Sequence, residues 1–418
     1  MKKTIKVLHV NTYDSGGGAA NAAVRIVESV NLSNIHAELL VQSGKKNTII
    51  LSKSIFRKFR PYLDKLPLLI YPNRNNELFS SAIIKNNKLI QYINHSDFDI
   101  VHLHWINAGM ISIEEICKIK KPIVWTLHDA WAYTGGCHLV PASCSLFKEE
   151  FGCRNCVKLS SSNIFNFDLA KFNYRRKLHS YHTKNDIYIV GVSNWITNVS
   201  RKSNLLSKYK HFTVGNPLDT KKYRIIKEKE KEKEKEKEKK VLLFIAVGGS
   251  DDSNKGFDDV YYIANNYPHC IEIRVLGGAL MEEEFIGNVN IKHVGYVDSQ
   301  NKLINEYNSA DCVIVPSRQE SFGQVASESL SCGTPVVCYD SSGLKDIVIH
   351  KVNGYLAKAF DPDDLLLGVL QVLNDNIYSR EACRASICNR FSYEKISENY
   401  REIYENVIRC NQSKLYKK

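Results

Sequence analysis

Short apolar runs alternate with stretches of helical periodicity along almost the whole chain. The first series of apolar runs lies at residues 5–11, 37–41, 100–103, 123–127 and 188–192. A second series lies at residues 241–247, 271–276, 291–294, 312–315 and 335–338. Runs without polar alternation predict strands buried on both faces, as in a parallel sheet covered by helices. The pattern therefore predicts an α/β protein with two doubly wound, Rossmann-like units.

A charged segment separates the two series. Residues 227–240 alternate lysine and glutamate, with eight Lys and six Glu, and this alternation leaves no apolar stripe that could pack. We therefore predict an N-terminal domain at 1–222, a charged linker at 223–240 and a C-terminal domain at 241–390. Residues 391–418 are predicted to form a final amphipathic helix. Its apolar side is formed by Ile396, Tyr400, Ile403, Tyr404 and Val407.

Composition and charge narrow the class of partner. The 418 residues are 44% hydrophobic and carry a formal net charge of +12, which favours an anionic partner such as a nucleotide diphosphate or an anionic lipid. No RNA- or DNA-binding motif is present, so nucleic acid is not expected. The chain shows no signal-peptide pattern and no apolar stretch of membrane-spanning length. We therefore expect a cytoplasmic protein whose 12 cysteines are mostly reduced.

The segment 315–337 carries the strongest chemical signal. An apolar strand ends near Pro316, a polar loop carries Glu320, and Gly323 opens a helix that contains Glu328. The start of a helix presents free N–H groups and partial positive charge, which suit a diphosphate. Seven residues separate the two glutamates, so both carboxylates can reach one pocket and accept hydrogen bonds from sugar hydroxyls.

This segment resembles the donor-site signature of glycosyltransferase family 4. The resemblance is carried by Glu320-x7-Glu328 and by the run Gly333-Thr334-Pro335-Val336-Val337. It extends to Gly295-Tyr296-Val297, Asn353-Gly354 and Phe391-Ser392-Tyr393-Glu394. The family comprises retaining, metal-independent enzymes of the GT-B fold. The resemblance therefore implies two Rossmann-like domains facing a cleft, with a C-terminal helix that crosses back to the first domain.

The resemblance also implies roles for individual residues. Glu320 would contact the transferred sugar and act as a catalytic residue, and Glu328 would hold the ribose of the donor. Gly323 and Gln324 would give backbone amides to phosphate or sugar. The donor would be a UDP- or GDP-sugar, and neither a catalytic metal nor another cofactor is expected.

A second phosphate contact is predicted at Lys255, which lies just before a helix at the end of a glycine- and aspartate-rich loop. The alternative is an ordinary solvated lysine at a helix start. The family usually has an arginine after the first glycine of this loop, whereas this chain has Gly249. Arg318 or Arg274 could replace that arginine, and the sequence does not decide between them.

The N-terminal half offers two further candidates. Gly17 and Gly18 follow a strand and open a helix, so they either allow close packing or, by the resemblance, approach the donor phosphate. His128 ends the strand 123–127 and is either structural or, by the resemblance, a catalytic contact to donor sugar or acceptor. Asp129 would then orient it. His102 and His104 are predicted to be core or rim residues.

Four cysteines cluster in a short insertion after this strand: Cys137, Cys144, Cys153 and Cys156. The Cys-x2-Cys half is typical of zinc sites, but the Cys-x6-Cys half is looser than usual. The sequence leaves two alternatives open, a structural zinc ion or four unligated thiols.

We therefore expect retaining transfer of a hexose-type sugar to a glycan or lipid-linked oligosaccharide, in surface-polysaccharide biosynthesis. The basic, aromatic segment 55–60 would touch anionic lipid at the inner face of the membrane. One alternative is a sugar-nucleotide epimerase of the same fold, which would not need an acceptor surface such as residues 50–95. Another is an inactive structural partner of a transferase, against which the intact Glu320 and Glu328 argue.

Overall fold

The computed structural model describes residues 4–44, 48–51, 56–75, 78–141, 143–160, 165–227, 239–246, 252–375 and 377–415. The chain divides into two compact units. The first unit consists of residues 1–217 and 396–418, and the second unit consists of residues 218–395. Most of the predicted linker, residues 228–238, lies outside the described residues.

The first unit is built on a six-stranded sheet in the order β2-β1-β3-β4-β5-β6, in which every pair is parallel. The order reverses between β1 and β3: β2 lies on one side of β1, and β3 to β6 follow on its other side. The strands are β1 (Ile5–Tyr13), β2 (Ile35–Ser43), β3 (Ile100–Leu103), β4 (Ile123–Leu127), β5 (Ile187–Gly191) and β6 (Lys210–Thr213).

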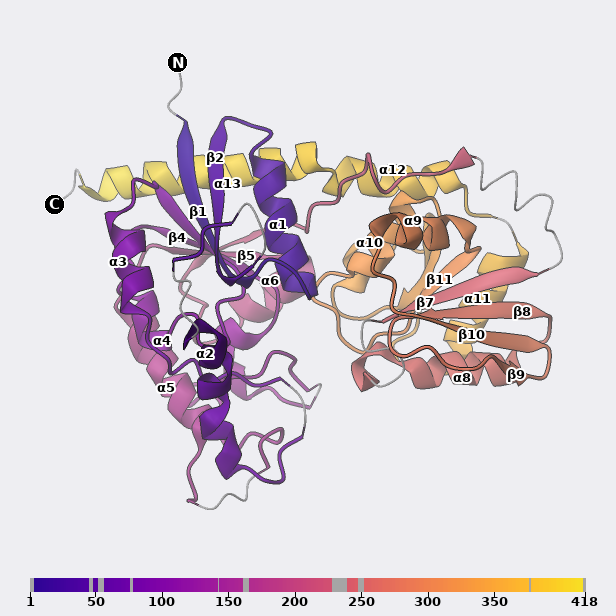
Figure 1. Ribbon diagram of the computed structural model, residues 1–418, viewed down its shortest axis with the longest axis horizontal. Helices are drawn as coiled ribbons and strands as arrows, with labels where there is room; N and C mark the ends of the chain where they lie inside the picture. The colour runs from indigo at the N-terminus through magenta and orange to yellow at the C-terminus, as the bar shows by residue number, and fades with distance from the viewer. Residues whose placement is uncertain are drawn as a thin grey trace. The chain divides into compact units, whose positions relative to one another are not determined.

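Helices cover this sheet and are fixed at their starts by side-chain caps. Asn86, Asp168 and Ser193 each accept a hydrogen bond from a backbone N–H of the first helical turn. α1 packs on β1 and β2, and α6 packs on β5 and β6 (Figure 1). The helices of the first unit are α1 (Gly18–Val30), α2 (Phe56–Lys65), α3 (Asn87–His95), α4 (Ile113–Ile116), α5 (Leu169–His182) and α6 (Asn194–Arg201).

The last helix, α13 (Tyr393–Leu415), enters the first unit at Ile396 and runs beside its sheet (yellow in Figure 1). Tyr400 and Tyr404 are fully buried on its apolar side. The Tyr404 hydroxyl lies 2.6 Å from His102 Nδ1, and the Tyr400 hydroxyl lies 3.1 Å from Thr126 Oγ1. The helix is therefore anchored to β3 and β4 by polar contacts as well as by apolar packing.

The second unit is built on a seven-stranded sheet in the order β13-β12-β11-β7-β8-β10-β9. All pairs are parallel except β9–β10. The chain starts at the centre with β7, builds outward through β8 and β10, and then continues on the other side with β11, so the order reverses between β7 and β11. The strands are β7 (Lys240–Ile245), β8 (Ile271–Leu276), β9 (Glu284–Ile286), β10 (Val289–Gly295), β11 (Cys312–Val315), β12 (Val336–Tyr339) and β13 (Gly354–Ala357).

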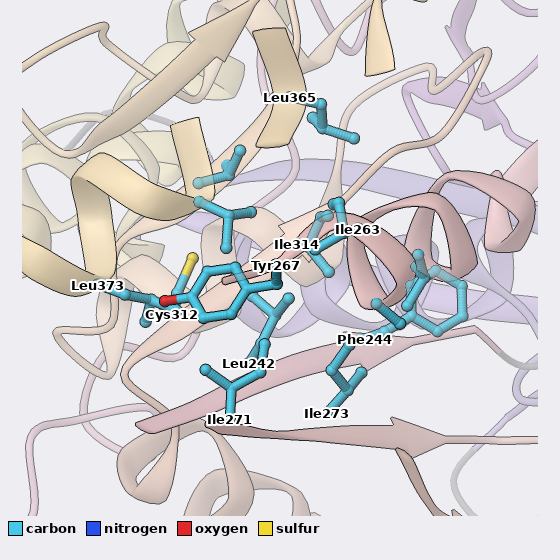
Figure 2. Packing of buried hydrophobic residues seen from close by; sticks show 14 of the residues in the cluster. Leu242, Phe244, Ile263, Tyr267, Ile271, Ile273, Cys312, Ile314, Leu365 and Leu373 are labelled. Carbon is cyan, nitrogen blue, oxygen red and sulfur yellow. The ribbon is translucent and has the colours of Figure 1, made fainter. Parts of the chain in front are cut away.

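Helices lie on both faces of the second sheet. α8 and α11 contact one another, and α9 and α10 form a second group that also contacts the sheet (Figure 1). Buried side chains from β7, β8, α8 and α11 pack together beneath one face, as Figure 2 shows for Leu242, Ile273, Ile263 and Leu373. Each such fully buried side chain contributes about 1.5–3 kcal/mol to the free energy of unfolding. The helices are α8 (Phe257–Asn266), α9 (Gln300–Ser309), α10 (Gln324–Ser331), α11 (Pro362–Asn374) and α12 (Arg380–Phe391).

Within the described part of the chain, none of the helices combines the length and the apolar character that crossing a membrane requires.

Candidate functional site

The predicted Lys255 and Glu320 meet at the point where the strand order of the second sheet reverses. Lys255 closes a 3-10 turn (Ser253–Lys255) in the connection after β7, and Glu320 lies in the connection after β11. The Lys255 Nζ lies 2.5 Å from Glu320 Oε1. In doubly wound sheets, ligands bind beyond the carboxyl ends of the strands at this reversal. The ion pair therefore occupies the position where the topology favours a ligand.

Hydrogen bonds between the Asn254 side chain and the Gln319 backbone hold the two connections together. The Asn254 side chain donates to the Gln319 carbonyl at 2.9 Å and accepts from the Gln319 N–H at 3.1 Å. Gly256, between Lys255 and α8, has a φ of +72°. A Cβ on Gly256 would lie 2.3 Å from the Pro316 carbonyl oxygen. A glycine is thus required here both by the backbone conformation and by the close approach of the second connection.

Two further hydrogen bonds hold Glu320, one to its carboxylate and one from its backbone N–H. The Ser317 hydroxyl donates to Glu320 Oε1 at 3.1 Å, and the Glu320 N–H donates to the Ser342 hydroxyl at 2.9 Å. Burial lowers the pKa of Lys255, but the Glu320 carboxylate raises it, and the net effect is a pKa above the ordinary value. Lys255 is therefore a permanent cation beside a fixed carboxylate, and both side chains remain partly exposed, at 27% and 20%.

α10 begins immediately after this loop. Gly323 precedes the helix with a φ of +111°, and Gln324 is its first residue. Glu328 lies on the second turn and is 6% exposed, and its Oε2 accepts a hydrogen bond of 3.0 Å from the Tyr307 hydroxyl of α9. Burial, and then the Glu328 charge, raise the pKa of Tyr307 well above its ordinary value, so the phenol stays protonated as the donor. The structure thus places Gln324 and Glu328 on the helix that follows the Glu320 loop, with Gly323 directly before it.

The two arginines considered as replacements at the Gly249 position are both held in ion pairs. Arg318 lies 2.9 Å from Asp259 and shares its loop with Glu320. Arg274 lies on β8 and pairs with Glu272 and Glu306. Gly249 itself lies outside the described residues.

In the first unit, Gly17 and Gly18 follow β1 and are exposed. A Cβ on either glycine would meet no described atom within 4 Å. Packing among the described residues therefore does not explain the two glycines.

His128 follows β4 in the same sheet and ends a chain of histidines. Its Nε2 lies 3.0 Å from His104 Nδ1, and His104 Nε2 lies 2.9 Å from His9 Nδ1. Burial lowers the pKa of His128 to about 4, against a smaller opposing effect of Asp129, and burial lowers the pKa of His9 to about 3. The imidazoles are therefore neutral at physiological pH and can donate or accept hydrogen bonds without carrying charge.

His102 and His104 are core residues, exposed by 0% and 3%, as predicted. Ring nitrogens of His9, His102 and His104 lie within 4.8 Å of one another, a spacing that could hold a metal ion. However, both nitrogens of each ring already face a protein partner: a neighbouring histidine, Tyr404 or Thr126. The group is accounted for as a hydrogen-bonded network between the sheet and α13.

Asp129 does not have the hydrogen-bonding role that the sequence suggested. Its Oδ2 lies 2.6 Å from His138 Nδ1 and accepts from Trp105 Nε1 at 2.9 Å, and its Oδ1 accepts from the Trp131 N–H. The prediction that Asp129 orients His128 is therefore replaced by one in which it orients His138. Sequence reasoning missed His138, because a single histidine in a loop gives no periodic or motif signal.

Comparison with known proteins finds a family likeness within the second unit. Residues 226–388 match the model of the family described as "Glycosyl transferases group 1". This segment, which lies within the second unit, is similar to the group 1 glycosyl transferases. The matched segment contains Lys255, Glu320, Gly323, Gln324 and Glu328.

Curated relatives align over part of the chain. An uncharacterised glycosyltransferase of Methanocaldococcus jannaschii is 33% identical over 132 residues, which cover 29% of this chain and 33% of the relative. A D-inositol 3-phosphate glycosyltransferase of Xylanimonas cellulosilytica is 32% identical over 164 residues, covering 36% of this chain and 39% of the relative. The chain thus spans little more than a third of the length of these relatives.

Solved structures agree with the fold over nearly the whole chain. Anabaena HepE in complex with UDP-glucose has a TM-score of 0.64 at 14% identity and covers 96% of this chain and 100% of its own. Sucrose-phosphate synthase from Thermosynechococcus elongatus has a TM-score of 0.67 at 15% identity and covers 97% of this chain and 100% of its own. At these identities the likeness concerns the fold alone, and it confirms the predicted GT-B class.

The close contact at Gly256 gives a testable prediction. Gly256→Ala should lower the free energy of unfolding by about 2–4 kcal/mol, because a left-handed backbone and a clash with the Pro316 carbonyl both oppose the methyl group. Gly287→Ala is the matched control: Gly287 has a φ of +58°, but no described atom lies within 4 Å of its Cβ position. It should cost only about 1–2 kcal/mol in urea unfolding. Equal losses for the two variants would show that the two loops do not approach as described.

The buried histidines predict acid sensitivity. In the unfolded chain they regain a pKa near 6.5, whereas in the folded chain burial holds the pKa of His9, His102 and His104 lower. Between about pH 7 and pH 4 the unfolded chain binds more protons, so stability should fall as pH falls, by up to about 1.4 kcal/mol per pH unit for each histidine. Urea unfolding at pH 8, 6 and 5 measures this slope, and His9→Gln should make it shallower. Equal stability at pH 8 and pH 5 would contradict the prediction.

Proposed function

We propose that the chain transfers a sugar from a nucleotide-sugar donor to a glycan or lipid-linked acceptor. The observation that carries the proposal is the Lys255–Glu320 ion pair at the strand-order reversal of the second sheet, directly before the start of α10. A cation and a helix start suit a diphosphate, and a carboxylate suits sugar hydroxyls. The family match over residues 226–388 supports the same reaction class.

In this proposal the second unit binds the donor. Lys255 and the N–H groups at Gly323 and Gln324 face the diphosphate, Glu320 contacts the transferred sugar, and Glu328 holds the ribose. Charge develops on the leaving diphosphate as the glycosidic bond breaks, and positive groups that are already in place stabilise that charge. Tyr307 positions Glu328 by donating to one of its oxygens, which leaves the carboxylate oriented before the donor arrives.

The first unit is proposed to serve the acceptor and the transferred sugar. His128 is neutral at physiological pH because burial lowers the pKa of its imidazole to about 4. A neutral imidazole can bind a sugar hydroxyl, but it cannot neutralise a phosphate. The exposed Gly17 and Gly18 leave room for a phosphate oxygen to reach the start of α1. Transfer of a hexose with retention, without a catalytic metal, is the outcome expected from the resemblance to family 4.

The donor can be tested by thermal unfolding in the presence of UDP-, GDP- and ADP-sugars. One nucleotide class should raise the stability, by about 2.7 kcal/mol when the ligand is at one hundred times its dissociation constant. Glu328→Gln should weaken that ligand about 10- to 100-fold, because a hydrogen bond to a charged acceptor is lost. Glu402→Gln, at an exposed position on α13, should bind like the wild type.

Each other outcome favours a different function. No stabilisation by any nucleotide sugar would favour an inactive structural partner. Stabilisation together with conversion of the donor sugar to its epimer, in the absence of any acceptor, would favour an epimerase. Proton NMR of the donor during incubation distinguishes epimerisation from transfer.

We further propose that α2 brings the first unit to an anionic membrane surface, where a lipid-linked acceptor would be found. Arg60 and Asp64 point into the unit: Arg60 Nε donates to the Gly109 carbonyl at 2.7 Å, and Asp64 accepts from the Ile83 N–H at 3.0 Å. The large apolar residues of α2 and the following turn are instead exposed by 43–76%. These residues are Phe56, Phe59, Tyr62, Leu63, Leu66 and Leu69.

Apolar side chains spaced three and four residues apart, next to Lys58 and Lys65, fit the interface of an anionic bilayer. A helix held in place by its inner side and apolar on its outer side can enter the headgroup region without unfolding. The proposed acceptor would then be reached from the inner face of a membrane, in surface-polysaccharide biosynthesis.

Flotation with vesicles tests this surface. The wild type should float with vesicles that contain phosphatidylserine and should float much less with phosphatidylcholine alone. The double variant Phe56→Ser/Phe59→Ser should bind about tenfold more weakly or worse, because two apolar side chains no longer enter the bilayer. Leu280→Ser, at an equally exposed leucine of the second unit, is the control. Unchanged flotation of the double variant would contradict the proposal.

A further inference from the structure

The four clustered cysteines of the first unit surround one cavity. Cys137, Cys144, Cys153 and Cys156 all line a space of about 150 Å³, together with residues of the same loop and Ala170 of α5. Cys137 and Cys153 are buried, and Cys144 and Cys156 are partly exposed. The fold therefore brings together side chains that are up to 19 positions apart in the sequence.

The closest pair has the spacing of two sulphurs on one metal ion. Cys137 Sγ and Cys156 Sγ lie 3.6 Å apart. Two thiolates on a tetrahedral zinc ion, with Zn–S of about 2.3 Å, are about 3.8 Å apart. A disulfide requires about 2.05 Å, and all four cysteines are free. The pair therefore fits shared ligation better than a disulfide. Among the described residues no three cysteine sulphurs lie within 4.8 Å of one another, so binding of one ion would bring Cys144 and Cys153 closer to this pair.

The Cys-x2-Cys half of the group makes a tight turn. Asn155, between Cys153 and Cys156, has a φ of +44°, and its N–H donates to the Asp168 carboxylate at 2.8 Å. A Cys-x2-Cys turn of this kind is typical of structural zinc sites, in which it supplies two of the thiolates.

A fully buried lysine contacts the same loop. The Nζ of Lys177 donates to the carbonyls of Trp131 and Thr134 and lies 3.6 Å from the centre of the Trp131 ring. Burial lowers the pKa of Lys177 well below its ordinary value, and Cys153 and Cys137 oppose this effect. A zinc ion with four thiolates carries a net charge of −2, so such a centre would favour the protonated form of Lys177.

We propose that Cys137, Cys144, Cys153 and Cys156 bind one zinc ion. Four protein ligands leave no open coordination position, so the site is structural rather than catalytic. It fixes the loop that follows β4: His138 adjoins the ligand Cys137, pairs with Asp129 at 2.6 Å and lies 2.8 Å from the Ser80 hydroxyl. The zinc site thereby supports the peptide next to His128. The inference does not depend on the proposed transferase reaction.

Metal content of the full-length protein, purified under reducing conditions, tests the site. The wild type should contain about one zinc ion per chain by mass spectrometry of metals. Cys153→Ser and Cys144→Ser should each lose at least nine-tenths of it. Cys117→Ser is the matched control, because Cys117 is partly exposed in the same unit and its thiol contacts only the Glu114 carbonyl among the described residues. It should keep its zinc.

A second measurement covers the case in which a cysteine variant does not fold. Replacement of zinc by Co²⁺ in the wild-type protein should give the thiolate-to-metal charge-transfer bands and the visible bands of a tetrahedral four-sulphur site. Absence of zinc from the wild type, a Co²⁺ spectrum without thiolate bands, or a disulfide between Cys137 and Cys156 found by mass spectrometry would each overturn the proposal. Equal zinc in Cys153→Ser and Cys117→Ser would overturn it as well.

Discussion

Parallel strand pairing constrains both sheets in the same way, because each strand must return through a crossover before the next one begins. Except for the antiparallel β9, the carboxyl ends of all strands then lie at one edge of each sheet, and the connections that leave this edge are available for chemistry. In the first unit these connections carry Gly17, Gly18 and His128. In the second they carry Lys255 and Glu320, which lie on either side of the reversal between β7 and β11. The positions of the candidate residues thus follow from strand order.

In the second unit, the ion pair between Lys255 and Glu320 joins the connection after β7 to the connection after β11. Lys255 and Glu320 are 65 residues apart in the sequence, and their contact is supported by Asn254 on one loop and by Ser317 on the other. Gly256 permits the approach because it has no side chain. In the proposed function, a diphosphate would compete with Glu320 for the ammonium of Lys255. In the first unit, His128 instead hydrogen-bonds to the buried His104, and burial lowers the pKa of both imidazoles.

The sequence predicted the interior of the fold better than its edges. The apolar runs 100–103 and 123–127 coincide with β3 and β4, because central strands are buried on both faces and contain few polar residues. β6, β9 and β13 were not predicted. All three are edge strands of three or four residues, paired on one side only, and β6 reads Lys-His-Phe-Thr. The Glu320 loop and the helix that carries Glu328 could be predicted from their local motif. The contacts of Asp129 with His138 and of Tyr404 with His102 could not, since they depend on long-range packing.

The central claim is that a nucleotide sugar binds at the Lys255–Glu320 pair and at the start of α10, and a crystal structure of the protein with a bound UDP- or GDP-sugar tests it most directly. The account predicts the diphosphate at the N–H groups of Gly323 and Gln324, with the Lys255 Nζ turned from Glu320 to a phosphate oxygen. It also predicts the ribose hydroxyls on Glu328. A nucleotide bound elsewhere, with the Lys255–Glu320 pair unchanged, would contradict the account.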